Sequence, residues 1–405
     1  MSTTQPRMIE LLEYQMMDLE GKALDEELGA LLWNTYRAHI EVAPPTFLNG
    51  HRWQLTPKGY VGQIPLTPDL HLVLLPRVPI ANLFRMLEYA YRLARFDMGL
   101  VATDSLQDVY ENLAAILARR VLERARRGLY RAYLPREERT TCVRGRMDLP
   151  RLARSEWDPR VHCRYRLHSP DIDDNQILAW TLLNVIRSGI CSEERLPTLR
   201  QAFRQLQHTV TLEPALARDC LGRSYSRLND DYRALHALCH FFLDTSGPSH
   251  RRGDHTIIPF LIDMPQLFET FVAQWLEENL PRRYWVLPQH SEKLNEAGTI
   301  VFRVDLVIWD GLLDRPVCVM DTKYKTEGQS GDLQQAIAYA QAVGCQQAML
   351  VYPAPLDSAL EVRAQDITVR DLTFDLSGNL VEAGERMLKE LLARIDEAEV
   401  VGRVA

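Results

Sequence analysis

The sequence predicts an α/β (α+β) chain with a hairpin-rich N-terminal domain followed by a mixed sheet flanked by helices. Residues 8–19 and 53–78 contain alternating segments broken by glycine and proline, which is typical of β-hairpins. The last third has the order helix, strand, strand, helix, strand, at 265–280, 302–309, 317–324, 333–343 and 348–352. That order is typical of a mixed α/β unit. A chain of 405 residues is long enough for two or three domains with separate cores.

Between these regions the sequence predicts mainly helices. Amphipathic patterns predict helices over 82–96 and 105–127, and further helices near 175–187, 196–207 and 228–243. Residues 128–170 contain many turn formers, and residues 245–256 form a polar stretch that could link two units. We therefore expect an N-terminal domain over 1–168 and a second domain over 169–405, with a helical lead-in at 169–245 and a core at 257–405.

Composition excludes several protein classes. Hydrophobic residues make up 46% and charged residues 25%, which are ordinary values for a globular protein and exclude extensive disorder. No apolar run approaches the ~18–20 residues of a membrane helix, and the N-terminus lacks the apolar segment of a signal peptide. We expect a cytoplasmic protein without a membrane partner. The seven cysteines include no C-x-x-C pair, so we expect reduced, mostly buried thiols and no zinc ribbon.

Charge is unevenly distributed along the chain. The net charge is −7, yet residues 116–168 contain 15 arginines, no lysine and six acids. A solvated arginine-rich face is the ordinary interpretation, while phosphate groups and acidic partner surfaces would both attract such a segment. The sequence leaves these alternatives open.

Two acids occur at strand positions where a carboxylate should reduce the stability of the fold. Strand alternation places Asp305 on the same face as Val307 and Trp309. In the next strand, 317–324, it places Asp321 and Lys323 on the face of the valines at 317 and 319. If the connection is centred on Leu313, the two carboxylates lie opposite each other. Neighbouring buried carboxylates need a compensating cation, and hard oxygen ligands suit Mg²⁺. The pattern therefore predicts a metal site, and the alternative is a salt bridge between Lys323 and Asp321 at a strand end.

Residues of the flanking helices extend this pattern. Glu269 lies at the margin of the apolar stripe of helix 265–280, where it could point towards the sheet or be an ordinary helix-flank residue. Gln335 and Tyr339 are one helical turn apart and share a face of helix 333–343. Such polar pairs are common on helix surfaces, so this pair is informative only together with the acids.

In this order, Glu269, Asp305, Asp321-Thr322-Lys323 and Gln335-x-x-x-Tyr339 resemble the PD-(D/E)XK nuclease fold, with valine in place of the usual proline before Asp305. The chain is further similar to the McrC family, the endonuclease subunits of McrBC-type, 5-methylcytosine-dependent restriction systems. This similarity is carried by residues 260–272 and 320–325, and upstream by 59–62, 75–77, 82–87, 144–149 and 171–175. Arg77 stands where the family pattern suggests a lysine.

The resemblance implies hydrolysis of DNA phosphodiesters with Mg²⁺, for which Mn²⁺ could substitute. Asp305, Asp321 and the carbonyl of Thr322 would bind the metal, and Lys323 would orient or help to deprotonate the attacking water. Glu269 would bind a second ion or position the first, and Gln335 and Tyr339 would support the site or contact the DNA backbone. These assignments follow from the family resemblance.

The resemblance also implies a partner. The chain has no G-x-x-x-x-G-K-[ST] motif, so we expect it to bind no nucleotide itself. A hexameric McrB-type AAA+ GTPase would supply GTP hydrolysis and recognition of methylated double-stranded DNA. The N-terminal region, with 53–78 as the preferred segment, would dock into that hexamer and stimulate it, although the aromatics of this segment could instead pack a small β core.

Three rival interpretations remain. His236 and His240 have the spacing of zinc hydrolases, but Ala237 replaces the glutamate of H-E-x-x-H and the neighbours are apolar. A catalytically inactive activator of a GTPase is the second rival, although Asp305, Asp321 and Lys323 are all present. The third rival is a nuclease that needs no partner.

Overall fold

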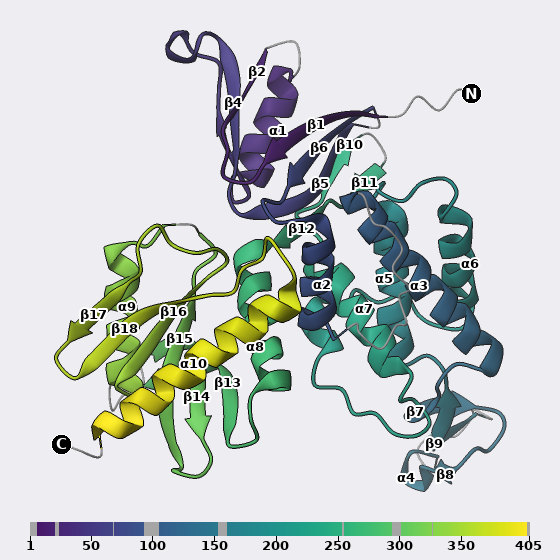
Figure 1. Ribbon diagram of the computed structural model, residues 1–405. Coiled ribbons are helices and arrows are strands. Elements are labelled where there is room, and N and C mark those ends of the chain that lie inside the picture. Colours follow the sequence, from purple (N-terminus) through teal and green to yellow (C-terminus); the bar gives the residue numbers. More distant parts are fainter. Residues whose placement is uncertain are drawn as a thin grey trace. The chain divides into compact units, whose positions relative to one another are not determined.

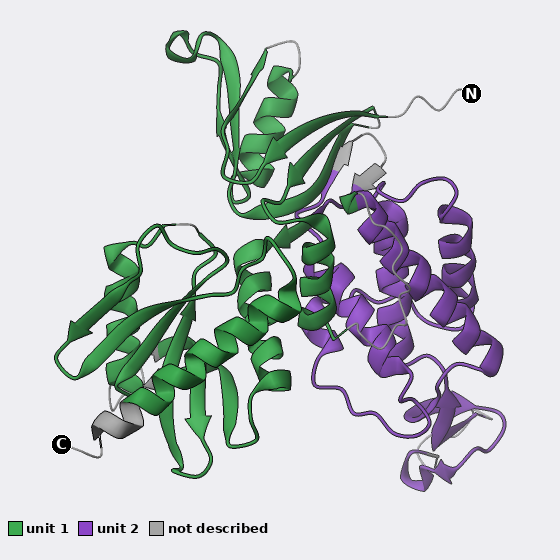
Figure 2. Cartoon of the chain, viewed as in Figure 1, with its two compact units in different colours: residues 1–106, 261–405 green, residues 107–260 purple. Residues whose placement is uncertain are grey.

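The chain forms two compact units. The computed structural model describes residues 6–20, 24–67, 69–92, 105–152, 160–252, 255–293, 301–325 and 327–402. Unit 1 combines residues 1–106 with 261–405, and unit 2 comprises 107–260 (Figure 2). The units divide the chain at other points than the boundary expected after residue 168, because the chain leaves unit 1 and later returns to it.

The N-terminal part of unit 1 is built from two small sheets. β1 (Arg7–Leu12), β6 (Leu70–Leu75), β5 (Tyr60–Thr67) and β12 (Phe260–Asp263) form one in that order, and β2 (Met17–Glu20), β4 (Arg52–Pro57) and β3 (Ile40–Ala43) form the other. The hairpin expected within 53–78 is present as β5 and β6 (Figure 1), whereas the hairpin expected within 8–19 is wrong, because β1 and β2 belong to different sheets and do not pair with each other. The sequence prediction missed helix α1 (Glu26–Tyr36), which is capped by Asp25 and buries Leu28, Leu32 and Tyr36 at helical spacing.

The C-terminal part of unit 1 is a six-stranded mixed sheet. Its order is β13 (Tyr284–Lys293), β14 (Val301–Asp310), β15 (Arg315–Thr322), β16 (Gln347–Tyr352), β18 (Ile367–Thr373) and β17 (Glu361–Ala364). The helices of this part are α8 (Met264–Asn279), α9 (Ser330–Val343) and α10 (Leu380–Gly402) (Figure 1). The predicted order holds as α8, β14, β15, α9 and β16. β13, β17, β18 and α10 were not predicted.

The packing of this sheet follows from its apolar residues. Strands β15, β16 and β18 are parallel; α9 joins β15 to β16, as expected for a parallel pair, whereas β17 lies between β16 and β18 in the chain. α9 contributes Ala336 and Ala340 to a core that contains Val307 and Val319. On α8, Trp275 lies against Gly384 of α10, where an added Cβ would be 2.3 Å from the indole. A side chain at position 384 would therefore separate these two helices.

Several bonds join the two parts of unit 1. The amide nitrogen of Met264 at the start of α8 donates to the carbonyl of Gly59 at 3.0 Å. Asn82 of α2 (Ile80–Ala90) donates to the carbonyls of Leu376 and Gly378, both at 2.8 Å. The hairpin region and the mixed sheet are thus one compact unit. The part of helix 82–96 beyond residue 92 lies outside the described residues.

Unit 2 is mainly helical. Its longer helices are α3 (Leu106–Arg127), α5 (Asp173–Arg187), α6 (Leu196–Gln207) and α7 (Tyr232–Asp244), close to the expected positions. The turn-rich prediction for 128–170 missed a three-stranded sheet, in the order β7 (Ala132–Thr140), β9 (Val161–Ser169) and β8 (Arg146–Met147), and the short helix α4 (Leu149–Leu152). The 3₁₀ turns at Phe47–Asn49 and Ala217–Cys220 and the hairpin β10 (His250–Arg252) and β11 (His255–Ile257) complete the short elements.

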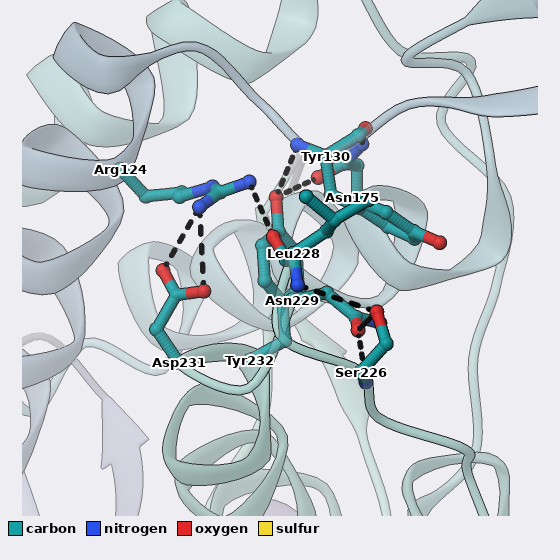
Figure 3. A network of polar contacts seen from close by, with 8 residues as sticks. All are labelled: Arg124, Tyr130, Asn175, Ser226, Leu228, Asn229, Asp231 and Tyr232. Carbon is teal, nitrogen blue, oxygen red and sulfur yellow. Dashed lines mark hydrogen bonds and ion pairs between the residues drawn. The ribbon is translucent and has the colours of Figure 1, made fainter.

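A polar network fixes the base of the three-stranded sheet to these helices (Figure 3). The Tyr232 hydroxyl accepts from the amide of Tyr130 at 3.0 Å and donates to Asn175 Oδ1 at 2.6 Å. The Asn175 amide donates to the carbonyls of Tyr130 and Pro170, which flank β7 and β9. Nearby, Arg124 pairs with Asp231. One buried asparagine, Asn175, thus holds the start of β7 close to the end of β9.

Two expectations, one about the cysteines and one about membrane-spanning helices, can be compared with the structure. All seven cysteines are free, and six of them are buried, as predicted. Among the described residues, no helix is long and apolar enough to cross a membrane.

Candidate active site

Asp305 and Asp321 lie on neighbouring antiparallel strands in the predicted register. Leu306 of β14 pairs with Met320 of β15, and Val307 pairs with Val319, so that the connection is centred on Leu313. Continued by one residue, this register sets Asp305 opposite Asp321. A bulge near the turn shifts the pairing only beyond Ile308. The structure therefore brings the two predicted carboxylates together.

The two carboxylates have different surroundings. Asp305 Oδ2 accepts hydrogen bonds from the amide of Thr322 at 2.9 Å and from its hydroxyl at 3.0 Å. Asp321 is 2% exposed, and burial together with the nearby Asp305 charge raises its pKa to about 7, although Lys323 acts in the opposite direction. The pair thus carries more negative charge than this site favours without a further cation.

Lys323 is held at this pair from two sides. Its Nζ lies 2.7 Å from Asp321 Oδ2 and donates to Gln335 Oε1 at 3.0 Å. Burial lowers the pKa of Lys323, but the Asp321 carboxylate outweighs burial and the pKa is raised overall. The side chain is therefore a fixed ammonium. The salt bridge expected under the alternative interpretation is present, but it occurs within the carboxylate pair and does not replace it.

The two helical side chains of the Q-x-x-x-Y pattern form a second layer behind Lys323. The Gln335 amide donates to the Tyr339 hydroxyl at 2.7 Å, so Gln335 connects Lys323 to Tyr339. The Tyr339 ring packs edge-on against Phe302 of β14. This chain fixes the ammonium position through α9.

Glu269 approaches the site from α8. Its Oε1 accepts from the Gln289 amide at 3.3 Å. Burial, and then the charge of Asp305, raise the pKa of Glu269. The side chain is thus close enough to Asp305 for the two charges to interact, while its role at a metal stays a prediction.

The donor set fits a hard divalent cation. Within the described parts of the chain, no three His, Cys, Asp or Glu side chains are grouped closely enough to hold a metal ion. Mg²⁺ at phosphate-processing sites commonly uses one or two carboxylates and takes its other ligands from water and substrate. Asp305 and Asp321 supply such a pair, and the raised pKa of Asp321 indicates uncompensated negative charge. Thr322 adjoins the pair, and the role of its carbonyl remains predicted.

A second connection to this site could not be predicted from the sequence. The hydroxyl of Tyr324 donates to Glu13 Oε2 at 3.1 Å, and the Arg77 amide donates to the same oxygen at 3.3 Å. Arg77 Nε also donates to the carbonyl of Glu13 at 3.0 Å. Glu13 is fully buried, and burial raises its pKa to about 7. Glu13 thus joins the hairpin region to the segment that follows Asp321, and Arg77, the departure from the family pattern, holds Glu13 in place.

The histidine pair has a structural environment. His236 is buried, and its Nδ1 and Nε2 lie 2.9 Å from the Tyr225 hydroxyl and 3.0 Å from the Asp174 carbonyl. Burial lowers the pKa of both His236 and His240. With both ring nitrogens of His236 engaged by protein groups, the packing interpretation accounts for this motif.

Comparisons with known proteins identify the family of the chain. A family model described as McrBC 5-methylcytosine restriction system component matches residues 38–353, which include Asp305, Asp321 and Lys323. The chain belongs to this McrBC component family. The type IV methyl-directed restriction enzyme EcoKMcrBC of Escherichia coli K12 is 22% identical over 219 residues, which cover 51% of this chain. The aligned region spans 60% of that McrBC relative.

The fold is also that of a solved McrBC structure. A chain in the half-complex from Thermococcus gammatolerans, an assembly of McrB AAA+ hexamers with bound McrC, superposes with a TM-score of 0.58 at 16% identity. The match covers 96% of this chain and 100% of that one. The cryo-EM structure of the Thermococcus gammatolerans McrBC complex gives a TM-score of 0.45 at 17% identity, over 68% of this chain and 89% of that one.

Proposed function

We propose that this McrBC family member is the Mg²⁺-dependent DNA endonuclease subunit of a modification-dependent restriction system, and that it docks onto and stimulates a hexameric AAA+ GTPase. The observation that carries the nuclease proposal is the arrangement of Asp305, Asp321 and Lys323. Two carboxylates and an ammonium converge where two strands of the mixed sheet pair. A buried carboxylate such as Asp321 beside a second acid costs stability, which favours a role in binding a cation and a phosphate.

Each side chain has a role consistent with its surroundings. Asp305 and Asp321 would hold the metal, which when bound polarises the scissile phosphate and lowers the pKa of water. Because the pKa of Lys323 is raised, its ammonium is a hydrogen-bond donor and not a base at neutral pH. It would therefore orient the attacking water and offset charge on the phosphate. Glu269, a carboxyl with a raised pKa, is suited to accept a proton from water or to bind a second ion.

The partner proposal rests on family membership and on the McrB–McrC assembly of the structural relative. Residues 53–78 were the preferred contact segment, but Trp53, Ile64 and Leu72 are buried in the core of the hairpin region. Phe47 and Leu48, between β3 and β4, are instead 80% and 85% exposed. Exposed apolar side chains at the end of a hairpin are suited to insertion into a partner. We propose that this pair makes the contact.

The test is cleavage of methylated and unmethylated plasmid with Mg²⁺ by wild type and Asp321→Ala, with and without the GTPase and GTP. The proposal predicts that the wild type cuts methylated DNA only when partner and GTP are present. Asp321→Ala should not cut but should still stimulate GTP hydrolysis. Cleavage by the wild type alone would support the stand-alone nuclease, and GTPase stimulation without any cleavage would support the inactive activator.

A further inference from the structure

The three-stranded sheet of unit 2 has two chemically different faces. Directly opposed residues of antiparallel strands point to the same side. The pairs Tyr133 with His168, Glu137 with Arg164, and Arg139 with His162 therefore share one face, as does Arg146 of β8 opposite Arg164. We call this the basic face, and it consists of Tyr133, Pro135, Glu137, Arg139, Arg146, His162, Arg164, Arg166 and His168.

The opposite face is only partly buried. Its Cys163 is 1% exposed and its Leu134 and Tyr165 are half-buried, whereas Arg136, Glu138 and Leu167 on the same face are exposed. On the basic face, all four arginines and Tyr133 are exposed. The two faces differ most in charge, because the opposite face carries one arginine and one acid, whereas the register places four arginines and one acid on the basic face.

The basic face has an excess of positive charge. It carries four arginines and one acid, Glu137, which pairs with Arg164 at 2.7 Å. Arg164 also lies 3.9 Å from Asp148. Over the part of the chain that the structure describes, neither Arg146 nor Arg166 has an acidic partner. These two guanidinium groups are available to an anionic ligand.

The face is held in shape at its base and at its edge. Asn175 donates to the carbonyls of Tyr130 and Pro170, which fixes the start of β7 relative to the end of β9 (Figure 3). At the edge, Gly145 has φ +65°, and an added Cβ would lie 2.5 Å from the Arg164 carbonyl oxygen. Glycine thus allows the chain to approach β9 and places Arg146 opposite Arg164. A preformed cationic surface loses little conformational entropy when it binds.

We propose that the basic face, which belongs to unit 2, binds the phosphate backbone of duplex DNA. Arginine binds phosphate oxygens through a planar fork, and Arg164 and Arg166 are two residues apart on one strand, roughly 7 Å. The excess of arginines on this face is complementary to phosphate groups and favours DNA, while the exposed Val143, Met147 and Leu149 of the adjoining segment make a protein partner the other outcome of the test. The exposed Tyr133 and His168 rings stack on each other, with centroids 4.8 Å apart. This inference rests on the proposed function in that DNA is taken as the substrate.

The test compares binding of a short, labelled, unmethylated duplex to the full-length wild type and two variants, without Mg²⁺ and without the partner. One variant is Arg146→Glu with Arg166→Glu. The matched control is Arg200→Glu with Arg204→Glu, which makes the same change of net charge at exposed positions of α6 in the same unit. Thermal unfolding of all three proteins checks that the exposed substitutions leave the fold intact.

The proposal predicts that the β8 and β9 variant loses DNA affinity by about tenfold or more. The slope of log affinity against log salt should decrease in magnitude by about two, one for each lost phosphate contact. The α6 control should bind like the wild type. Equal losses in both variants, or no binding by the wild type, would overturn the proposal. So would unchanged DNA binding by the β8 and β9 variant, and a separate measurement of GTPase binding by the same variant then shows whether the basic face serves the protein partner.

Cleavage by the wild type with unchanged DNA binding by the variant would overturn this inference alone. Binding that depends on the basic face in a chain that never cleaves would overturn the proposed nuclease function and leave the binding surface supported. The two proposals therefore fail in distinguishable ways.

Discussion

The hydroxyl of Tyr324 donates a hydrogen bond of 3.1 Å to Glu13, 311 positions earlier in the chain. Tyr324 directly follows Lys323, and Glu13 directly follows β1 of the hairpin region. The proposed partner-docking region and the proposed metal site are thus joined through one buried carboxyl. The connection lies within unit 1 and is reinforced by Arg77.

Glu13→Gln should change how stability depends on pH. The Glu13 pKa rises from 4.5 to about 7 in the folded chain. Between these values the unfolded chain has released the proton while the folded chain retains it, so the free energy of unfolding falls as pH rises through this window. Glu13 accounts for roughly 3 kcal/mol of this fall in the free energy of unfolding. Urea unfolding from pH 4.5 to 8 should show a smaller fall in the variant. Asp321, whose pKa is also raised to about 7, retains its own contribution.

Glu10→Gln is the matched control, because Glu10 is exposed on β1. It should leave the pH dependence of unfolding as it is in the wild type. If Glu13→Gln shows the wild-type dependence too, Glu13 is not protonated in the folded chain at pH 6.

Gln335→Leu should reduce cleavage by about tenfold or more, because Lys323 loses the hydrogen bond to Gln335 and keeps only its contact with Asp321. KM for DNA should change little, since Gln335 acts through Lys323. Gln335→Glu keeps an acceptor for the ammonium and should restore most of the rate. Steady-state kinetics and the pH profile of all three proteins check this. A rate unaffected by the leucine would show that α9 does not position the ammonium.

Phe47→Ser with Leu48→Ser should abolish stimulation of the GTPase and leave stability nearly unchanged, because both side chains are largely exposed. The control is Leu312→Ser, at a position that is 78% exposed in the turn between β14 and β15. GTP hydrolysis by the partner, titrated with each chain, is the measurement. Full stimulation by the double variant would place the contact elsewhere on the chain.

Asp310→Asn should destabilise the chain by about 2 kcal/mol without removing cleavage. Asp310 is fully buried at the end of β14, and burial alone would raise its pKa, but Arg283 and the amides of Leu312 and Leu313 lower it overall. A lowered pKa contributes stability at neutral pH that is lost as pH falls below the unfolded value. Urea unfolding at pH 7 and pH 3 should therefore show a smaller difference between variant and wild type at pH 3. Asp314→Asn, at an exposed position of the same turn, should have little effect.

The parts of the site that depend on local periodicity could be predicted from the sequence. Side chains of a strand alternate between its two faces, and this alternation along two strands was sufficient to predict that Asp305 and Asp321 lie close together. The Lys323 contact with Gln335 crosses 12 positions and the Glu13 contact with Tyr324 crosses 311, so both depend on tertiary packing. The return of the chain to unit 1 after residue 260 is likewise non-local.

The arginine-rich sheet shows another limit. Turn formers and dense charge in 128–170 indicated turns, yet β7 and β9 pair over nine residues, from Ala132 with Ser169 to Thr140 with Val161. Exposed strands lack the apolar alternation that a sequence pattern requires. The residues of the basic face could be identified only from the strand register.

The measurement that tests the account most directly is Mg²⁺-dependent DNA cleavage by Asp321→Asn and Asp310→Asn, with the GTPase partner and GTP present. Both substitutions remove one buried carboxylate from the β14 and β15 region, but only Asp321 adjoins Asp305 and Lys323. We expect Asp321→Asn to lose cleavage by about a thousandfold or more and Asp310→Asn to cut like the wild type. Wild-type cleavage by Asp321→Asn would contradict the assignment of this carboxylate pair as the catalytic centre.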